Sequence, residues 1–159
     1  MSRRTRGVVV SGLLVLVAGC SDPVEIDPPD LDAADRAACE AFAEDLPPTL
    51  ADEEPVETEP EEPLGAAWGD PAIAVVCGVD LPDGFDEAAE CVEANGVGWY
   101  APPEQYDDQA ADVTIFAVTY RPVVELRLPG DYRPNGLAAA LAELAEPVRR
   151  HLSEVQDCL

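Results

Sequence analysis

The stretch VTIFAVTYRPVVELRL, residues 113–128, says most about the architecture of this chain. Residues 113–120 are rich in β-branched and aromatic side chains, which favour strands. Residues 123–128 alternate valine and leucine with charged residues, as a strand with one buried face does. Because only Arg121-Pro122 separates the two runs, the stretch predicts a hairpin and hence an antiparallel sheet.

Two more runs complete a predicted sheet of about four strands. Residues 72–77 (AIAVVC) are apolar at every position, which suits a strand buried on both faces. Residues 82–84 (PDG) have the composition of a turn. Residues 97–100 (VGWY) then predict another strand, which Pro102-Pro103 ends.

Two helices are predicted, one on each side of these strands in the sequence. Asp30 or Asp32 can cap a helix that ends before Pro47-Pro48. Across residues 137–155 apolar side chains recur every three or four positions, which predicts a second helix with one apolar stripe. Pro147 lies inside it, so we expect a kink there or two consecutive helices.

Together these elements predict an α+β fold. We expect a small, mostly antiparallel sheet with the N-terminal and the C-terminal helix packed on one of its faces. The sequence contains no internal repeat, and residues 31–159 are enough for one domain with a modest core.

The first twenty residues have the three parts of a bacterial lipoprotein signal. Three arginines precede an apolar run at residues 8–18, and Val17-Ala18-Gly19-Cys20 forms a lipobox of small residues and a cysteine. At about 1.5 Å per residue the run spans roughly half of a hydrocarbon core, too little for a membrane helix. We expect removal of residues 1–19 and acylation of Cys20, including palmitate, which would anchor the protein at the extracytoplasmic face of the plasma membrane.

Two alternatives remain for this segment. It can be an ordinary cleaved secretory signal in which the cysteine is incidental. Arg3-Arg4 also fits twin-arginine export, but the residues that follow lack the apolar pair of that signal, which favours the general secretory route.

The charge of the mature chain is strongly negative. Removal of the three signal arginines leaves six of the nine basic residues against 33 acidic ones, so the formal charge changes from −24 to −27. Such a chain is repelled by nucleic acids and anionic headgroups. We therefore expect no nucleic-acid partner, and contact with the membrane only through the lipid anchor.

Two stretches combine carboxylates with prolines. Residues 20–30 predict an extended acidic tether behind the anchor, and residues 47–63 predict a disordered or loosely ordered acidic loop. The loop can also be a weak, unspecific Ca²⁺ or Mg²⁺ sink, although neither stretch has the spacing of a calcium loop.

Four cysteines follow the anchor: Cys39, Cys77, Cys91 and Cys158. An even number in an exported chain predicts two disulfides, with three possible connectivities. We favour Cys77–Cys91, which closes a short loop, and Cys39–Cys158, which fixes the C-terminus. A zinc site is the weaker alternative because the cysteines are not arranged in pairs, so no metal or other cofactor is expected.

The chain also resembles a known family. The residues that carry the resemblance are Ala67-Trp68-Gly69-Asp70-Pro71, then Cys77-Gly78-Val79, and later Gly98-Trp99. They resemble an uncharacterised family of actinobacterial lipoproteins, domain of unknown function 3515, over most of the chain from Cys39 onward. The resemblance implies an exported, usually lipid-anchored protein of the cell envelope, and it supplies no catalytic residues.

Four residues around these motifs form a possible binding surface. Trp68 beside Asp70, and Trp99 with Tyr100, can present aromatic rings and a carboxylate to a sugar. The alternative, which we favour, is structural: a core tryptophan, a glycine with an unusual backbone angle, an aspartate that caps a turn, and a proline that starts a strand.

The inventory of reactive side chains argues against an enzyme. The mature chain has only Ser21 and Ser153 as serines, neither in a nucleophile elbow, and His151 is its single histidine, beside two arginines. We therefore expect a non-enzymatic binding or structural module that contacts an envelope protein or wall component, with its oligomeric state open. The alternative is a hydrolase that cleaves wall saccharide or peptide through a carboxylate pair.

Overall fold

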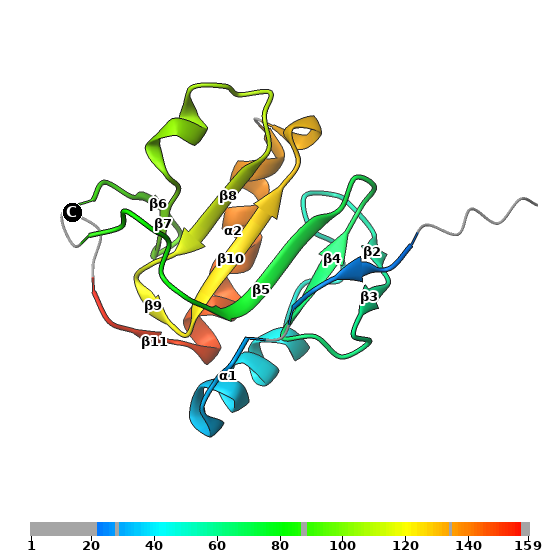
Figure 1. Cartoon of the computed structure of the whole chain (residues 1–159), viewed down its shortest axis with the longest axis vertical. Helices are drawn as coiled ribbons and strands as arrows, with labels where there is room; N and C mark the ends of the chain where they lie inside the picture. The colour runs from blue at the N-terminus through cyan, green and yellow to red at the C-terminus, as the bar shows by residue number, and fades with distance from the viewer. Residues whose placement is uncertain (1–21, 28, 87–88, 134, 157–159) are drawn as a thin grey trace, which may run out of the picture.

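The structure is a computed structural model that describes residues 22–27, 29–86, 89–133 and 135–156. Its centre is a seven-stranded sheet in which every pair of neighbouring strands is antiparallel (Figure 1). In spatial order the strands are β2 (Pro55–Val56), β4 (Gly65–Trp68), β5 (Ile73–Val79), β10 (Val123–Leu128), β8 (Val113–Ala117), β7 (Val97–Tyr100) and β6 (Val92–Ala94).

The prediction of about four strands was wrong. The additional strands β2, β4 and β6 are two, four and three residues long. They contain proline, small residues or a central glutamate, so none shows the run of β-branched residues that identifies a strand in sequence. Their pairing with longer neighbours, rather than their own composition, makes them strands.

The predicted hairpin at residues 113–128 is confirmed. Strands β8 and β10 pair in register from Glu125 opposite Phe116 to Leu128 opposite Val113. The connection contains a further short strand, β9 (Tyr120–Arg121), which pairs with β11 (Ser153–Glu154) in a separate two-stranded sheet.

The acidic segments that were expected to be a tether and a loose loop are in part regular structure. Strand β1 (Val24–Glu25) pairs in parallel with β3 (Thr58–Glu59), and the next residue, Ile26, is only 1% exposed. Within the predicted loop, Leu50 is fully buried in the main core. The chain is therefore ordered from a point very close to Cys20, because backbone pairing and two apolar side chains outweigh the charge repulsion.

Both helices pack on one face of the sheet, as predicted. Helix α1 (Ala33–Glu44) begins at Asp32, whose carboxylate accepts hydrogen bonds from the amides of Ala34 at 2.8 Å and Asp35 at 2.9 Å. Helix α2 (Asn135–His151) continues through Pro147, so the alternative of two consecutive helices was wrong. Contacts of α1 with β4 and β5, and of α2 with β6 and β7, place one helix over each half of the sheet.

The main core lies between the helices and the sheet. Alternate residues of β10, namely Val124, Leu126 and Leu128, point into it, as the sequence pattern predicted. The opposite face of the sheet carries a smaller apolar cluster of Tyr100, Phe116, Val118 and Val123, which residues of the segment after β5 cover. Both faces of the sheet are thus partly buried.

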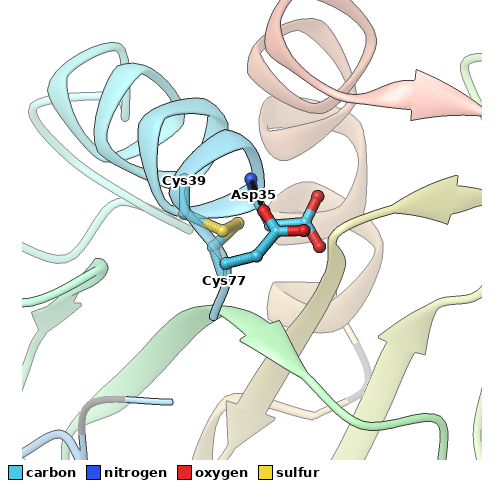
Figure 2. Close-up of a disulfide and its surroundings, with 4 residues drawn as sticks. Asp35, Cys39 and Cys77 are labelled. Atoms are coloured by element: carbon cyan, nitrogen blue, oxygen red, sulfur yellow. Dashed lines mark hydrogen bonds between the residues drawn. A yellow bond between two sulfur atoms is a disulfide. The ribbon is translucent and has the colours of Figure 1, made fainter. Parts of the chain in front are cut away.

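A disulfide between Cys39 and Cys77 joins α1 to β5 (Figure 2). Both residues are 0% exposed, and they meet because each points into the core from opposite sides. The predicted pairs Cys77–Cys91 and Cys39–Cys158 were therefore wrong, and Cys39–Cys77 is the one bridge that joins two described cysteines. Cys91 packs with the cluster on the other face of the sheet and is itself disulfide-bonded; Cys158 lies outside the described residues.

Candidate functional site

The residues of the predicted binding surface do not form one surface. Trp68 and Trp99 are 1% and 0% exposed, and both pack in the main core under the helices. Tyr100 is 5% exposed on the opposite face of the sheet, where its ring meets that of Phe85 edge to face at 5.2 Å. Asp70 is exposed. Neither tryptophan ring is available to stack on a sugar.

The turn after Trp68 has a structural role. Gly69 has a φ of +78°, and a side chain there would bring its Cβ to 2.6 Å from the hydroxyl oxygen of Tyr132. That hydroxyl donates a hydrogen bond to the carbonyl of Pro71 at 2.8 Å. Burial raises the pKa of Tyr132, and the Glu53 carboxylate raises it further, so the phenol stays protonated and keeps this bond. The Trp-Gly-Asp-Pro motif is accounted for by the fold.

A polar groove lies elsewhere, between helix α2 and the hairpin of β6 and β7. We call it the hairpin groove; its volume is about 980 Å³. Buried Tyr120 and Ala145 contribute to its lining, together with exposed polar and charged side chains. The lining residues are Glu93, Asn95, Gly96, Tyr120, Ala142, Ala145, Glu146, Arg149, Arg150 and Glu154.

The turn of the β6–β7 hairpin fixes one wall of this groove. Asn95 and Gly96 have φ angles of +50° and +84°, which are the left-handed values of a two-residue Asn-Gly hairpin turn. The side-chain Nδ2 of Asn95 donates to the backbone carbonyl of Ala142 at 3.3 Å, and this bond holds the turn against α2.

Arg149 crosses the same turn from the helix. Its Nη1 donates to the carbonyl of Asn95 at 3.3 Å. Its Nε would lie 3.5 Å from a Cβ at position 96, which is ordinary van der Waals contact, so the arginine side chain lies directly over the turn. The hairpin and the helix therefore hold each other, and they hold the guanidinium at the groove.

Arg150, the other groove cation, is already neutralised. It forms ion pairs with Glu146 on its own helix and with Asp45 at the end of α1. His151 Nε2 lies 3.0 Å from the same Asp45 carboxylate. The hydrogen bond with His151, followed by the bond and charge of Arg150, lowers the pKa of Asp45. This cluster ties the ends of the two helices together.

Three charged groups of the groove have no such partner. No carboxylate in the described part of the chain lies within 4.0 Å of the Arg149 guanidinium. The same criterion gives no ion pair for Glu93 or Glu154 among these residues. The groove thus offers one guanidinium and two carboxylates to a ligand.

The lining of the groove is polar and charged. Its ten lining residues include no serine, threonine, cysteine or histidine. Across residues 22–156, apart from those the structure leaves undescribed, no group of three or more His, Cys, Asp or Glu side chains is placed to hold a metal ion. The arrangement suits hydrogen bonding and ion pairing with a polar ligand.

Three smaller grooves lie elsewhere on the surface. One of about 500 Å³ lies between α1 and residues 60–65, one of about 510 Å³ lies beside Arg121, and one of about 310 Å³ lies along β3. Burial lowers the pKa of Arg121, whose guanidinium donates to the carbonyls of Val118 and Tyr120 and so fixes the β8–β10 connection. Trp68 and Tyr100 line none of the four grooves.

Sequence reasoning missed the hairpin groove, although one signal for it was present. Asn95-Gly96 is this signal, because Asn-Gly between short strands is the strongest local sign of a tight hairpin. For Arg149, its place in the last turn of a helix indicates only a favourable interaction with the negative end of the helix dipole. Its contact with a turn 54 residues away depends on the fold.

Comparison with known proteins identifies the family of this chain but no individual relative. No curated protein and no solved structure matches the chain. Within the described residues, no helix is long and apolar enough to cross a bilayer. A family model, described as a protein of unknown function, matches residues 6–156, which is nearly the whole chain. The expected resemblance is confirmed, and the chain belongs to the DUF3515 family of proteins of unknown function.

Proposed function

We propose that this chain is an exported, lipid-anchored protein of the cell envelope, and that its domain is a non-enzymatic module that binds a polar partner in the hairpin groove. The observation that carries the binding site is the guanidinium of Arg149. In a mature chain with six arginines and 33 acidic residues, this cation is held at the hairpin groove without a carboxylate partner among the described residues.

The rigidity of the groove supports a binding role. Both of its walls are regular elements, and two hydrogen bonds between Asn95, Ala142 and Arg149 join them. A site that is formed before the ligand arrives loses less conformational entropy on binding. The polar lining, which contains no serine, threonine, cysteine or histidine, favours recognition over covalent chemistry.

The proposed anchor rests on the lipobox at residues 17–20 and on the apolar run before it. Acylation of Cys20 with two or more chains would give stable membrane attachment, which one chain does not. The domain would then meet its partner at the outer surface of the membrane.

Photo-crosslinking in living cells tests this proposal. We would place p-benzoylphenylalanine at Ala142, in the groove, and in a control at Asp83, an exposed loop residue outside all four grooves. The expected result is a discrete adduct from position 142 in the membrane fraction and none from position 83. In a Cys20→Ala variant, the protein should leave the membrane fraction and lose acyl labelling.

Equal crosslinking from both positions, or none from either, would count against the groove. Membrane association that is unchanged in the Cys20→Ala variant would count against the lipid anchor. The two parts of the proposal are therefore tested separately.

A further inference from the structure

We infer that the ligand of the hairpin groove is a short peptide that carries both a free carboxylate and a free ammonium group. The inference rests on the proposed function, because it names the ligand class of the same site. It follows from the kind, number and pairing of the charges that line the groove.

The carboxylate would bind Arg149. A guanidinium has five N–H donors in a planar fork that matches the two oxygens of a carboxylate. The structure gives Arg149 one hydrogen bond, from Nη1 to the carbonyl of Asn95, so four donors have no protein acceptor among the described residues. Because the hairpin turn already holds the side chain, little entropy is lost when a carboxylate binds.

The ammonium group would bind the carboxylates of the same groove. Glu93 comes from the edge strand β6 and Glu154 from β11, and neither has an ion-pair partner within the described residues. Glu146 is partly engaged by Arg150. A ligand with one charge of each sign therefore meets an oppositely charged group at each end.

Two other classes of ligand fit less well. A polyanion such as a phosphorylated sugar would face three glutamates and only two arginines, one of which is paired. A neutral saccharide is usually held by an exposed aromatic ring, whereas the one aromatic residue of the lining, Tyr120, is 4% exposed. Its hydroxyl lies 3.4 Å from the carbonyl of Gly96.

The test uses the full mature protein in detergent micelles and the tripeptide Ala-Lys-Ala. Three forms of the tripeptide are compared: both termini free, the C-terminal amide, and the amide with an acetylated N-terminus and lysine. Binding is followed through the NMR shifts of the backbone amides of Asn95 and Gly96. We expect the free form to bind roughly tenfold more tightly than the amide, which is the usual effect of a charge-assisted hydrogen bond.

Arg149→Gln is the informative variant, and Arg36→Gln is its matched control. Arg36 lies on α1 and lines a different groove, so its replacement leaves the hairpin groove intact. Because both variants replace an arginine by glutamine, they change the net charge equally. The preference for the free carboxylate should vanish in Arg149→Gln and persist in Arg36→Gln. A purely structural role of Arg149 would weaken all three peptides alike, or none.

Absence of binding by the free tripeptide, or binding without preference for its charged ends, would overturn this inference. Such a result combined with an in-cell adduct at position 142 would leave the proposed function intact and reject only the ligand class. Absence of both would reject the groove itself.

Discussion

Single side chains in this molecule mostly serve the fold, and few are left for a ligand. The arginines illustrate this: Arg121 and Arg133 donate to backbone carbonyls, while Arg127 and Arg150 form ion pairs. Arg149 differs because its one bond holds a turn and leaves most of its donors available. The function of this residue was not predictable from sequence, because the identity of the neighbours of an arginine depends on tertiary contacts.

Asp45 gives a pH-dependent prediction. Its pKa is lowered below the usual value of 3.8 by His151 and Arg150, so the ionised form is stabilised in the folded state. A lowered pKa stabilises the fold at neutral pH, and this stabilisation is lost as the pH falls through the folded-state pKa. Asp45→Asn should therefore lower the urea midpoint at pH 7 and have little effect near pH 2.

The control for this prediction is Asp83→Asn, at an exposed residue of the loop after β5. It should leave the midpoint unchanged at both pH values. A deficit of Asp45→Asn that is equally large at low pH would mean that the carboxylate charge is not what joins the two helix ends.

Among the helices and strands, the long periodic ones were predictable. The cap at Asp32, the apolar stripe of α2 and the β8–β10 hairpin each follow from local pattern, and the structure contains them. The short strands β2, β4 and β6 exist because a longer neighbour offers them backbone partners. Sequence patterns do not show that a short segment will pair with a longer strand, so the predicted sheet had too few strands.

The disulfide shows the same limit. Loop length suggested the pair Cys77–Cys91, but these two cysteines belong to clusters on opposite faces of the sheet. The pair Cys39–Cys158 is excluded because Cys39 is bonded to Cys77. Only the packing of α1 on β5 brings Cys39 and Cys77 together, with their Cα atoms 5.5 Å apart. Connectivity was thus decided by which face of each element carries the cysteine.

Removal of this bridge gives a second stability prediction. The two cysteines are 38 residues apart, and on the chain-entropy model closing such a loop stabilises the fold by about 4 kcal/mol. The double variant Cys39→Ala/Cys77→Ala should lose a similar free energy of unfolding in urea. The fold should persist at low temperature, since both helices keep their apolar contacts.

The matched measurement is the single variant Cys39→Ala, which leaves Cys77 as a buried thiol and should lose about as much as the double variant. If the free energy of unfolding falls by less than about 1 kcal/mol in both variants, the disulfide adds little to a packing of α1 on β5 that is already stable without it.

For the molecule as a whole, the distance between the domain and the proposed anchor is limited by how soon after Cys20 the chain joins the fold. Val24 donates its amide proton to the carbonyl of Glu57 at 2.8 Å, four residues after Cys20. Four residues span at most about 14 Å. The domain would therefore sit close to the membrane, with the edge formed by β1, β2 and β3 nearest to it.

The hairpin groove lies at the opposite edge of the seven-stranded sheet (Figure 1). The edge strands of this sheet are β2 and β6, and six strand spacings of about 4.8 Å separate them by roughly 29 Å. Strand β1, which begins four residues after Cys20, pairs with β3 near the β2 edge, whereas the groove adjoins β6 and β7 (Figure 1). We therefore expect the groove to face away from the membrane, toward the wall.

Hydrogen–deuterium exchange of the lipidated protein tests the binding role of the groove together with its orientation. Exchange would be compared between isolated cell envelopes and lipid vesicles that contain only the purified protein. We predict slower exchange in envelopes for residues 93–98 and 142–150, and no change for residues 55–61 at the membrane-proximal edge. Added protection confined to residues 55–61, or none at any described segment, would contradict the assignment of the hairpin groove as the binding surface.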